Sequence, residues 1–298
     1  MAAETTLPQW LWRSRQVVPK PVALPSQPAE PSAHFFVDFP CVVRYEGAWW
    51  LFYTVADGQH QRIVAAVSDD LHTWQHPKVV LDKGAKDQFD AAGVAAAWVL
   101  RHNDLDEPLP KLRRGMFWLA YRGHAADSVT SAIGLAFSSD WNRWQRFDGN
   151  PILTVHGGEP WEQAGLQDPC LLERDHLFWL FYVGRNDRAA VGLALSTDFL
   201  VWSRDLENPL LRSETDLIGR PFCVRYQRRW WILVGDGEGL RAASSDDLRH
   251  WRWLDEPPLT FEGLTRIANP YLFWYDGKLW LFFSAEQDGR RQIFCVAL

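Results

Sequence analysis

The sequence is short of three things: long apolar runs, concentrated positive charge and cysteine. No stretch of the 298 residues approaches the ~20 consecutive apolar residues that a membrane span requires. The 31 basic and 37 acidic residues are interspersed and give a formal net charge of −6. No basic stripe is therefore available for nucleic acid, and neither a nucleic-acid nor a membrane partner is expected.

The few cysteines do not suggest a metal site. Cys41, Cys170, Cys223 and Cys295 lie inside predicted strands, where cysteine usually acts as a small buried apolar residue, and their spacing fits no zinc motif. Residues 1–16 lack a basic segment followed by an apolar one, so we expect no secretory signal. The simplest interpretation is a reduced, cytoplasmic protein without cofactors, and the sequence shows no dedicated site for a central structural calcium ion.

Tryptophan, by contrast, is abundant, with 18 copies, and five of these mark an internal repeat. In each repeat a Trp is followed by Leu or Ile, and in four repeats a Pro lies ten residues upstream. A short apolar segment and a polar turn separate the two, and a second apolar segment follows the Trp. The tryptophans are Trp50, Trp118, Trp179, Trp231 and Trp280, and the prolines are Pro40, Pro169, Pro221 and Pro270.

Each repeat continues with a third apolar segment. In four repeats this segment leads into the pattern S-x-D-x-x-x-W, first at Ser68, Asp70 and Trp74. The Ser and Asp are typical of turn caps that join a third strand to a fourth. Such a four-stranded unit cannot bury both faces alone, so the units must pack on one another. With helical periodicity almost absent, we predict an all-β fold in which residues 1–298 form a single five-bladed β-propeller domain, with four antiparallel strands per blade.

The two ends of the chain are predicted to close this ring. The fifth unit stops after its third strand at Leu298. We predict that the segment QWLWRSRQVV, residues 9–18, supplies the missing fourth strand, with Trp10 or Trp12 in the place of Trp74.

The residue before each repeat proline varies, whereas the structural positions recur. This column holds Phe39, Asp168, Arg220 and Asn269, with a residue near Ala95 in blade two. The first strands of propeller blades line the central axis and begin at one mouth, so these side chains should converge there. Because the column changes from blade to blade, we expect it to surround an asymmetric ligand.

Further acids and aromatic residues lie close to this column in the sequence. Carboxylates and arginines can bind sugar hydroxyls, and aromatic rings can stack on sugar C–H faces, so the mixture favours a small-molecule carbohydrate or glycoside partner. An isolated Asp before Pro is also a common turn starter, and a surface histidine is an ordinary structural residue. The candidate residues are Asp38, Asp90, Glu162 and Asp168, together with His34, Phe39, Trp161, Asp216, Arg220, Arg266 and Asn269.

The sequence resembles the five-bladed propeller glycosidases, that is, glycoside hydrolase families 43 and 32 and their relatives, over essentially all five blades. The best-matching segments are IGLAFSSDWNRW…NPIL, LQDPCLL and VGLALSTDFLVW…NPLL. In those families a blade-one carboxylate is base or nucleophile, a middle-blade Asp orients and tunes, and a Glu before the blade-four strand donates the proton. The resemblance implies that Asp168 is the tuning acid and Asp38 the base or nucleophile. We expect Asp90 to be a second positioning acid and Glu162 to substitute as proton donor, with Asp90, Asp216 and His34 as alternative donors.

The sequence departs from this family pattern in blades one and four. Phe39 occupies the pre-proline position of blade one, so Asp38 reaches the mouth only if a bulge re-aims it, because successive strand residues point to opposite faces. In blade four Gly219 and Arg220 stand where the Glu is expected, and the nearest acid is Asp216. The usual proton donor is therefore missing from its usual place.

Three functions are compatible with these residues. The leading one is hydrolysis of a small oligosaccharide or glycoside. The second is phosphorolysis, as in the related family 130, with Arg220 and Arg266 binding inorganic phosphate; the same arginines would suit the carboxylate of a uronate. The third is a propeller that has lost glycosidase activity and binds a glycan or a partner, or catalyses non-sugar chemistry. Oligomeric state is not indicated by any of these patterns.

Overall fold

The computed structural model describes residues 7–24, 35–125, 130–212, 215 and 217–298. The chain is all-β, as predicted: strands dominate, and the helical elements among the described residues are α1 (Leu7–Arg13) and two single turns, Ser14–Gln16 and Pro160–Glu162. None of these helices is long and apolar enough to cross a membrane.

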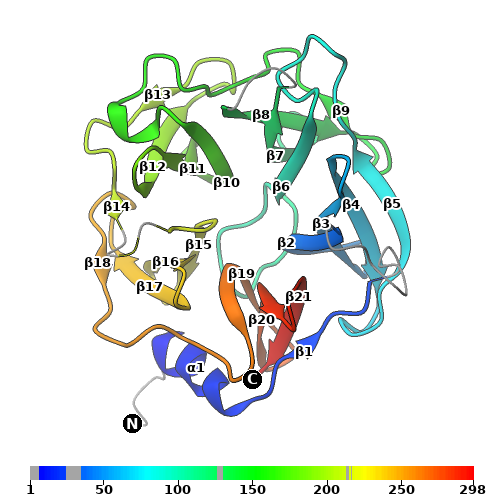
Figure 1. Ribbon diagram of the computed structural model, residues 1–298, viewed down its shortest axis with the longest axis vertical. Coiled ribbons are helices and arrows are strands. Elements are labelled where there is room, and N and C mark those ends of the chain that lie inside the picture. The colour runs from blue at the N-terminus through cyan, green and yellow to red at the C-terminus, as the bar shows by residue number, and fades with distance from the viewer. Residues whose placement is uncertain (1–6, 25–34, 126–129, 213–214, 216) are drawn as a thin grey trace.

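The strands form antiparallel meanders that surround a central axis (Figure 1). The first two meanders are β2 (Phe35–Tyr45), β3 (Ala48–Asp57), β4 (Gln61–Ser68) and β5 (Gln75–Leu81), then β6 (Gly93–Val99), β7 (Phe117–His124), β8 (Ser131–Ser138) and β9 (Gln145–Arg146). The third is β10 (Gly165–Arg174), β11 (Leu177–Arg185), β12 (Ala189–Ser196) and β13 (Ser203–Arg204), with β14 (Leu211–Arg212) also paired to β12. The fourth is β15 (Phe222–Tyr226), β16 (Arg229–Gly235), β17 (Leu240–Ser245) and β18 (Arg252–Trp253).

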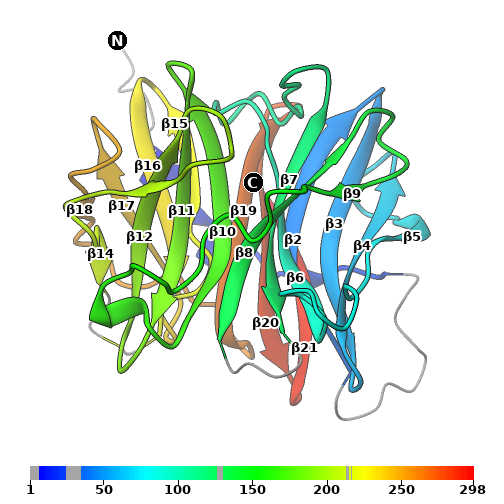
Figure 2. The ribbon, with the colours of Figure 1, turned by 90° about the horizontal axis from the view of Figure 1, so that it is seen from above.

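The last meander is β19 (Thr265–Tyr275), β20 (Lys278–Gln287) and β21 (Arg290–Ala297), and the short strand β1 (Lys20–Pro21) completes it. The first two meanders are joined into one eight-stranded sheet by a single parallel pair, Gln61 with Gly93. Seen from above, the sheets stand side by side around the axis (Figure 2).

The N-terminal segment closes the last meander, but not with the residues that we predicted. Lys20 and Pro21 pair with Cys295 and Phe294, whereas residues 9–18 form no strand. The QWLWR part belongs to α1, where Leu7 and Leu11 lie one turn apart and are both buried. The prediction that Trp10 or Trp12 replaces Trp74 is therefore wrong: Trp10 instead packs edge-on against Trp274, with ring centroids 5.0 Å apart.

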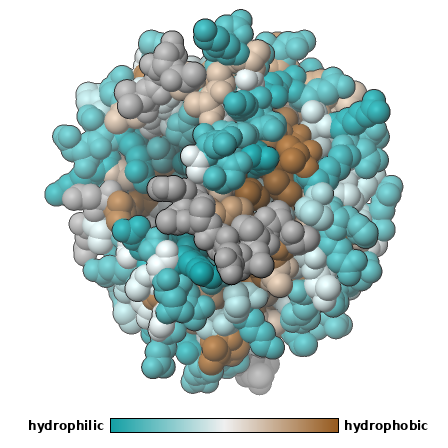
Figure 3. Space-filling view, turned by 45° about the vertical axis from the view of Figure 1, so that its right-hand side comes forward, coloured by the Kyte–Doolittle hydropathy of each residue, from teal (hydrophilic) through white to brown (hydrophobic). Residues whose placement is uncertain are grey.

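The repeated sequence positions have the structural roles expected of them. Trp118, Trp179, Trp231 and Trp280 are buried in one hydrophobic core cluster that extends through the meanders. In the first Ser-x-Asp turn, the Ser68 hydroxyl accepts a hydrogen bond from the backbone N–H of Leu71, and Asp70 caps the two N–H groups that follow. On the face shown in Figure 3 hydrophilic side chains predominate, and apolar areas lie between them.

The segment between β6 and β7 covers one end of the central axis. The backbone N–H of Arg44 donates to the carbonyl of Pro108 at 2.8 Å, and the backbone N–H of Trp274 donates to the carbonyl of Leu105 at 2.8 Å. Leu105 is fully buried, and its own N–H donates to the carbonyl of Arg225 at 2.9 Å. These contacts lie at the ends of the first strands, whereas the variable column lies at their beginnings, so a ligand site there is open at the other mouth.

Candidate active site

Bulges re-aim the variable column toward the axis. In four first strands the pairing register shifts at the column: between Asp38 and Cys41, Ala95 and Trp98, Gln167 and Cys170, and Ala268 and Tyr271. The column residues have left-handed backbone conformations that side chains rarely adopt, with φ of 59° at Phe39, 55° at Ala96, 56° at Asp168 and 54° at Asn269. The blade-two member is therefore Ala96. The bulge that Asp38 needed is present, and strained backbone of this kind is typical of functional sites.

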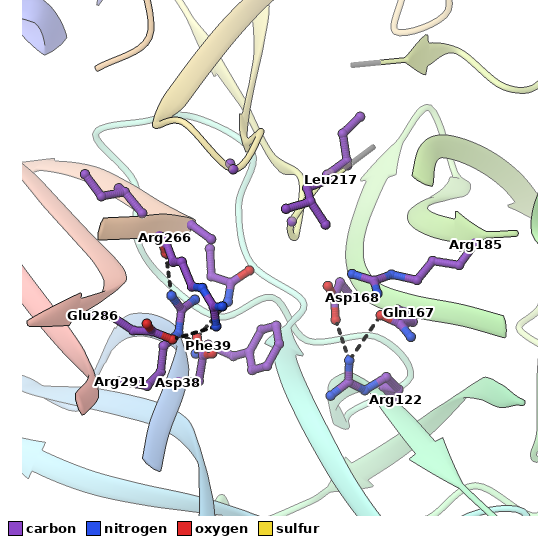
Figure 4. A pocket seen from close by; sticks show the side chains of 17 residues that line it. Asp38, Phe39, Arg122, Gln167, Asp168, Arg185, Leu217, Arg266, Glu286 and Arg291 are labelled. Carbon is purple, nitrogen blue, oxygen red and sulfur yellow. Dashed lines mark hydrogen bonds and ion pairs between the residues drawn. The ribbon is translucent and has the colours of Figure 1, made fainter. Parts of the chain in front are cut away.

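The column surrounds a cavity of about 490 Å³ at the starts of the first strands (Figure 4). This volume suits a small ligand. Three carboxylates and four arginines line it. The charged lining residues are Asp38, Asp168, Glu286, Arg122, Arg185, Arg266 and Arg291. The uncharged lining residues include Phe39, Gln167, Leu217 and Asn269.

Asp38 is buried and its two carboxylate oxygens are already engaged. Oδ1 accepts hydrogen bonds from the N–H of Phe39 at 2.7 Å and from Nδ2 of Asn269 at 2.7 Å, and Oδ2 accepts one from Nε of Arg291 at 2.9 Å. Burial by itself would raise the pKa of Asp38, but the charge of Arg291 and hydrogen bonds from Arg291, Ser284 and Asn269 outweigh it and lower the pKa. Asp38 is therefore held as a carboxylate.

Asp168 has the opposite electrostatic character. It is 4% exposed, and its Oδ1 accepts a hydrogen bond of 3.2 Å from Nη1 of Arg122. Burial is the largest influence and raises the pKa of Asp168, against the lowering charges of Arg122, Arg185 and Arg220; the charge of Asp38 raises it further. Two carboxylates of one cavity thus have pKa values displaced in opposite directions, which is the arrangement of an acid–base pair.

The cavity arginines were not predicted, apart from Arg266. Arg122 ends up beside Asp168, Arg291 beside Asp38, and Arg266 donates to Glu286 at 3.1 Å. Arg122 and Arg185 lie on second strands and Arg291 lies on a third strand, so the residues of the first strands alone do not indicate them. One sequence signal was available: Arg122 and Arg185 both stand near the end of a second strand, beside the repeated glycines Gly123 and Gly184.

Asp90 does not reach the cavity. It is fully buried, and its Oδ2 accepts hydrogen bonds from the hydroxyl of Tyr121 at 2.9 Å and from Nε of Arg146 at 2.8 Å. These three residues come from the segment before β6, from β7 and from β9. Asp90 therefore ties the strands of the second meander together, and the structure gives it no contact with the cavity lining.

Glu162 occupies the equivalent place in the third meander. Its Oε2 accepts a hydrogen bond from the hydroxyl of Tyr182 at 2.7 Å, and its Oε1 accepts one from Nε of Arg204 at 2.5 Å. Trp161 stacks on Tyr182 with ring centroids 6.0 Å apart, so this residue too lies away from the cavity lining. The predicted placement of Glu162 and Trp161 at the mouth is corrected: an acid, a tyrosine and an arginine recur here as a structural unit.

Arg220 is placed beneath the cavity rather than in it. It is fully buried, and its guanidinium donates to the backbone carbonyls of Ala97 at 3.2 Å, Phe39 at 3.5 Å and Pro40. It also lies 5.9 Å from the ring centroid of Phe39. Arg220 therefore holds the column together from below. Phe39, Arg266 and Asn269 line the cavity as predicted, and His34 and Asp216 lie outside the described residues.

The described residues offer no obvious metal site. No group of three or more His, Cys, Asp or Glu side chains among them is arranged to hold a metal ion. Burial raises the pKa of Cys41, Cys170 and Cys295, as expected of buried thiols that act as apolar residues.

Comparison with known proteins identifies the family of the chain. The model of the glycosyl hydrolases family 32 N-terminal domain matches residues 29–219, and the chain belongs to this family. The predicted resemblance to the propeller glycoside hydrolases of families 32, 43 and 130 is confirmed.

Two curated relatives come from Thermoanaerobacter sp. (strain X514). A 1,2-beta-oligomannan phosphorylase is 25% identical over 201 residues, which cover 62% of this chain and 65% of that protein. A beta-1,2-mannobiose phosphorylase is 35% identical over 78 residues, or 26% of this chain and 24% of that protein. The match thus spans less than two thirds of either relative. A solved structure titled glycoside hydrolase shares the fold, with a TM-score of 0.81, 19% identity and coverage of 99% of this chain and 96% of that one.

Proposed function

We propose that the protein cleaves the glycosidic bond of a small oligosaccharide or glycoside by hydrolysis, with Asp168 as proton donor and Asp38 as the ionised partner. The observation that carries this proposal is the pair of carboxylates in one cavity with pKa values displaced in opposite directions. Breaking a glycosidic bond needs one carboxyl group to protonate the leaving oxygen and a second, ionised one on the opposite face of the sugar.

This assignment moves the proton donor from Glu162 to Asp168. Glu162 and Asp90 are both held in buried ion pairs outside the cavity, and blade four offers no acid at the column in the described part of the chain. Asp168 has a raised pKa and lies at the cavity wall, which are the two properties that a general acid needs. Oδ2 of Asp38 accepts a hydrogen bond from Nε of Arg291. A carboxylate oxygen can accept a second one, so Oδ2 can still activate a water molecule or attack the sugar.

The cavity also suits a small sugar substrate. Phe39 lies in its wall as an aromatic lining residue, with the guanidinium carbon of Arg122 5.3 Å from the centroid of its ring. We count each meander as one blade of a five-bladed ring, and the segment between β6 and β7 covers the far end of its axis. The substrate therefore enters from one side. The cytoplasmic location expected from the sequence stays a prediction.

A second candidate function is phosphorolysis of a glycoside. Two observations favour it: four arginines line the cavity, and both curated relatives are named phosphorylases. A phosphorylase needs one carboxylic acid to protonate the leaving group and cationic groups to hold inorganic phosphate. Asp168 would keep the same role in this reaction, and phosphate would replace water as the attacking group.

Turnover on a panel of aryl glycosides and short oligosaccharides, with and without phosphate, tests both candidates. We expect turnover that is lost in Asp38→Asn and in Asp168→Asn, and retained in Arg143→Gln, an exposed arginine in a turn at the opposite end of the strands. Turnover that depends on phosphate would establish phosphorolysis. No turnover on a broad panel, from a protein that melts cooperatively, would contradict both candidates and favour a propeller that binds a glycan or acts on another class of substrate.

A further inference from the structure

The lining of the cavity holds four arginines and three carboxylates, so one arginine has no acidic partner of its own in the lining. Three of its four arginines have a carboxylate of the same cavity within ion-pair distance: Arg122 with Asp168 at 3.2 Å, Arg291 with Asp38 at 2.9 Å and Arg266 with Glu286 at 3.1 Å. The fourth, Arg185, has no carboxylate within 4 Å among the residues that the structure describes, and no hydrogen bond from its side chain is found there.

Arg185 is placed to meet a ligand. It is the last residue of β11 and lines the cavity, and its Nε atom is buried without a hydrogen-bond partner in the described structure. In Figure 4 its side chain extends over the cavity beside Asp168 and Gln167, with the apolar Leu217 across from it. A buried polar atom without a partner is costly, so a bound anion would complete this part of the cavity.

The chemistry of the site limits what that anion is. A guanidinium presents a planar fork of donors that matches a carboxylate, and Arg185 is the lining arginine without an acid of the cavity beside it. Inorganic phosphate carries more than one negative charge near neutral pH, more than the single guanidinium of Arg185 balances. The neighbouring guanidinium of Arg122 already donates to Asp168 and Gln167. A monoanion with a planar head group is the better match.

We propose that Arg185 binds the carboxylate of an acidic sugar, so that the substrate is a glycoside or oligosaccharide of a uronic acid. This inference rests on the proposed glycoside cleavage, because Asp168, the proton donor, shares the wall on which Arg185 lies. The carboxylate of the uronic acid would be held by Arg185 while the glycosidic oxygen meets Asp168. Arg185 would then select between acidic and neutral sugars without taking part in the chemistry.

Binding measurements separate this inference from the reaction. Glucuronate, galacturonate and mannuronate are each titrated against the native protein in parallel with glucose, galactose, mannose and inorganic phosphate. We expect at least one uronate to bind about 10- to 100-fold more tightly than its neutral counterpart, as befits a charged hydrogen-bonded pair. Arg185→Gln should remove this preference, with a larger loss of affinity for the uronate than for its neutral counterpart. Arg185→Lys should keep part of it, and Arg143→Gln should keep all of it.

Turnover of matched 4-nitrophenyl uronides and neutral glycosides completes the test. In Asp168→Asn we expect reduced turnover but an intact preference for the uronate. A uronate preference that depends on Arg185, without turnover of any glycoside, would support the subsite and refute the proposed cleavage. Asp168-dependent turnover of neutral glycosides without any uronate preference would refute the subsite and leave the cleavage standing. Phosphate binding that is lost in Arg185→Gln, with no uronate bound, would also overturn the inference, because the anion would then be phosphate.

Discussion

Arg291 Nε donates a hydrogen bond of 2.9 Å to Asp38 Oδ2, although the two residues are 253 positions apart in the sequence. Arg291 comes from β21 and Asp38 from β2, so the pair joins the last meander to the first. The Asp38 carboxylate also accepts a hydrogen bond from Nδ2 of Asn269, which lies in β19. The contact between the ends of the ring therefore fixes the ionisation state of one of the two carboxylates on which the proposed chemistry depends.

Replacing Arg291 should change the pH dependence of turnover. Burial raises the pKa of Asp38, and Arg291 supplies the largest opposing influence. In Arg291→Gln the pKa of Asp38 should therefore rise, so the acidic limb of the kcat/KM profile should move to higher pH. Arg291→Lys keeps the charge and should move it less. An acidic limb that stays in place in Arg291→Gln would show that Asp38 is not the ionised group of the reaction.

The loss of turnover in Asp168→Asn should depend on how strongly the leaving group of each substrate needs to be protonated. Asp168→Asn removes the proposed donor, which typically lowers turnover by about 10²- to 10⁴-fold. The loss should be largest for methyl glycosides and oligosaccharides, whose leaving groups are strongly basic, and smallest for dinitrophenyl glycosides, whose leaving groups depart without protonation. Steady-state rates on both types measure this difference. An equal loss on both types would mean that Asp168 has another role, such as positioning the sugar.

Asp168→Asn should also change stability in a pH-dependent way. Because the folded-state pKa of Asp168 is raised, the native state holds this proton more tightly than the unfolded state does. The stabilisation is fully present below the ordinary pKa of 3.8 and is lost as pH rises through the folded pKa. Above the folded-state pKa the native protein contains a buried ionised carboxylate at this position, which Asn avoids while its side-chain oxygen still accepts a hydrogen bond from Arg122. Thermal melts between about pH 4 and pH 8 should show Asp168→Asn more stable at the upper end, with the advantage shrinking toward the lower.

The fold could be predicted from the sequence because its repeats combine two kinds of position. Trp-Leu pairs and Ser-x-Asp turns recur since every meander needs the same packing and the same turn, and both have the roles expected of them. The variable column was also recognisable, and Phe39, Asp168 and Asn269 do line one cavity. What the sequence could not give is the local backbone, because the bulges that turn the column inward place non-glycine residues at positive φ. The repeat prolines follow three of these residues, but the bulge at Ala96 has no proline after it.

Nearness in sequence to the column was a poor guide to which acids reach the cavity. Asp90 and Glu162 lie at similar distances before a first strand, but each follows an aromatic residue that packs on a glycine of the second strand. A Cβ at Gly123 would come within 2.5 Å of the Phe89 ring, and one at Gly184 within 2.3 Å of the Trp161 ring. The aromatic–acid pair thus recurs with its own glycines. A feature that repeats between units indicates a structural role. Conversely, the column was a candidate ligand site because its residues differ from unit to unit.

The repeated ion pairs should accordingly matter for stability and not for turnover. Glu162→Ala leaves the hydroxyl of Tyr182 and the guanidinium of Arg204 without their buried acceptor, which should lower the free energy of unfolding by about 2–3 kcal/mol. Chemical denaturation measures this loss. Glu162→Gln keeps the shape and one accepting oxygen, so it should lose less.

The matched change Asp90→Ala in the second meander should behave in the same way, because Asp90 accepts from Tyr121 and Arg146 in the same arrangement. At temperatures well below the melting transition, both variants should keep native kcat/KM on every glycoside that the protein cleaves, whereas Asp168→Asn should lose turnover without losing stability at neutral pH. Loss of turnover in folded Glu162→Ala, with the basic limb of its pH profile removed, would instead return the proton donor to Glu162 and require the cavity to be completed by a movement of the Pro160–Glu162 turn.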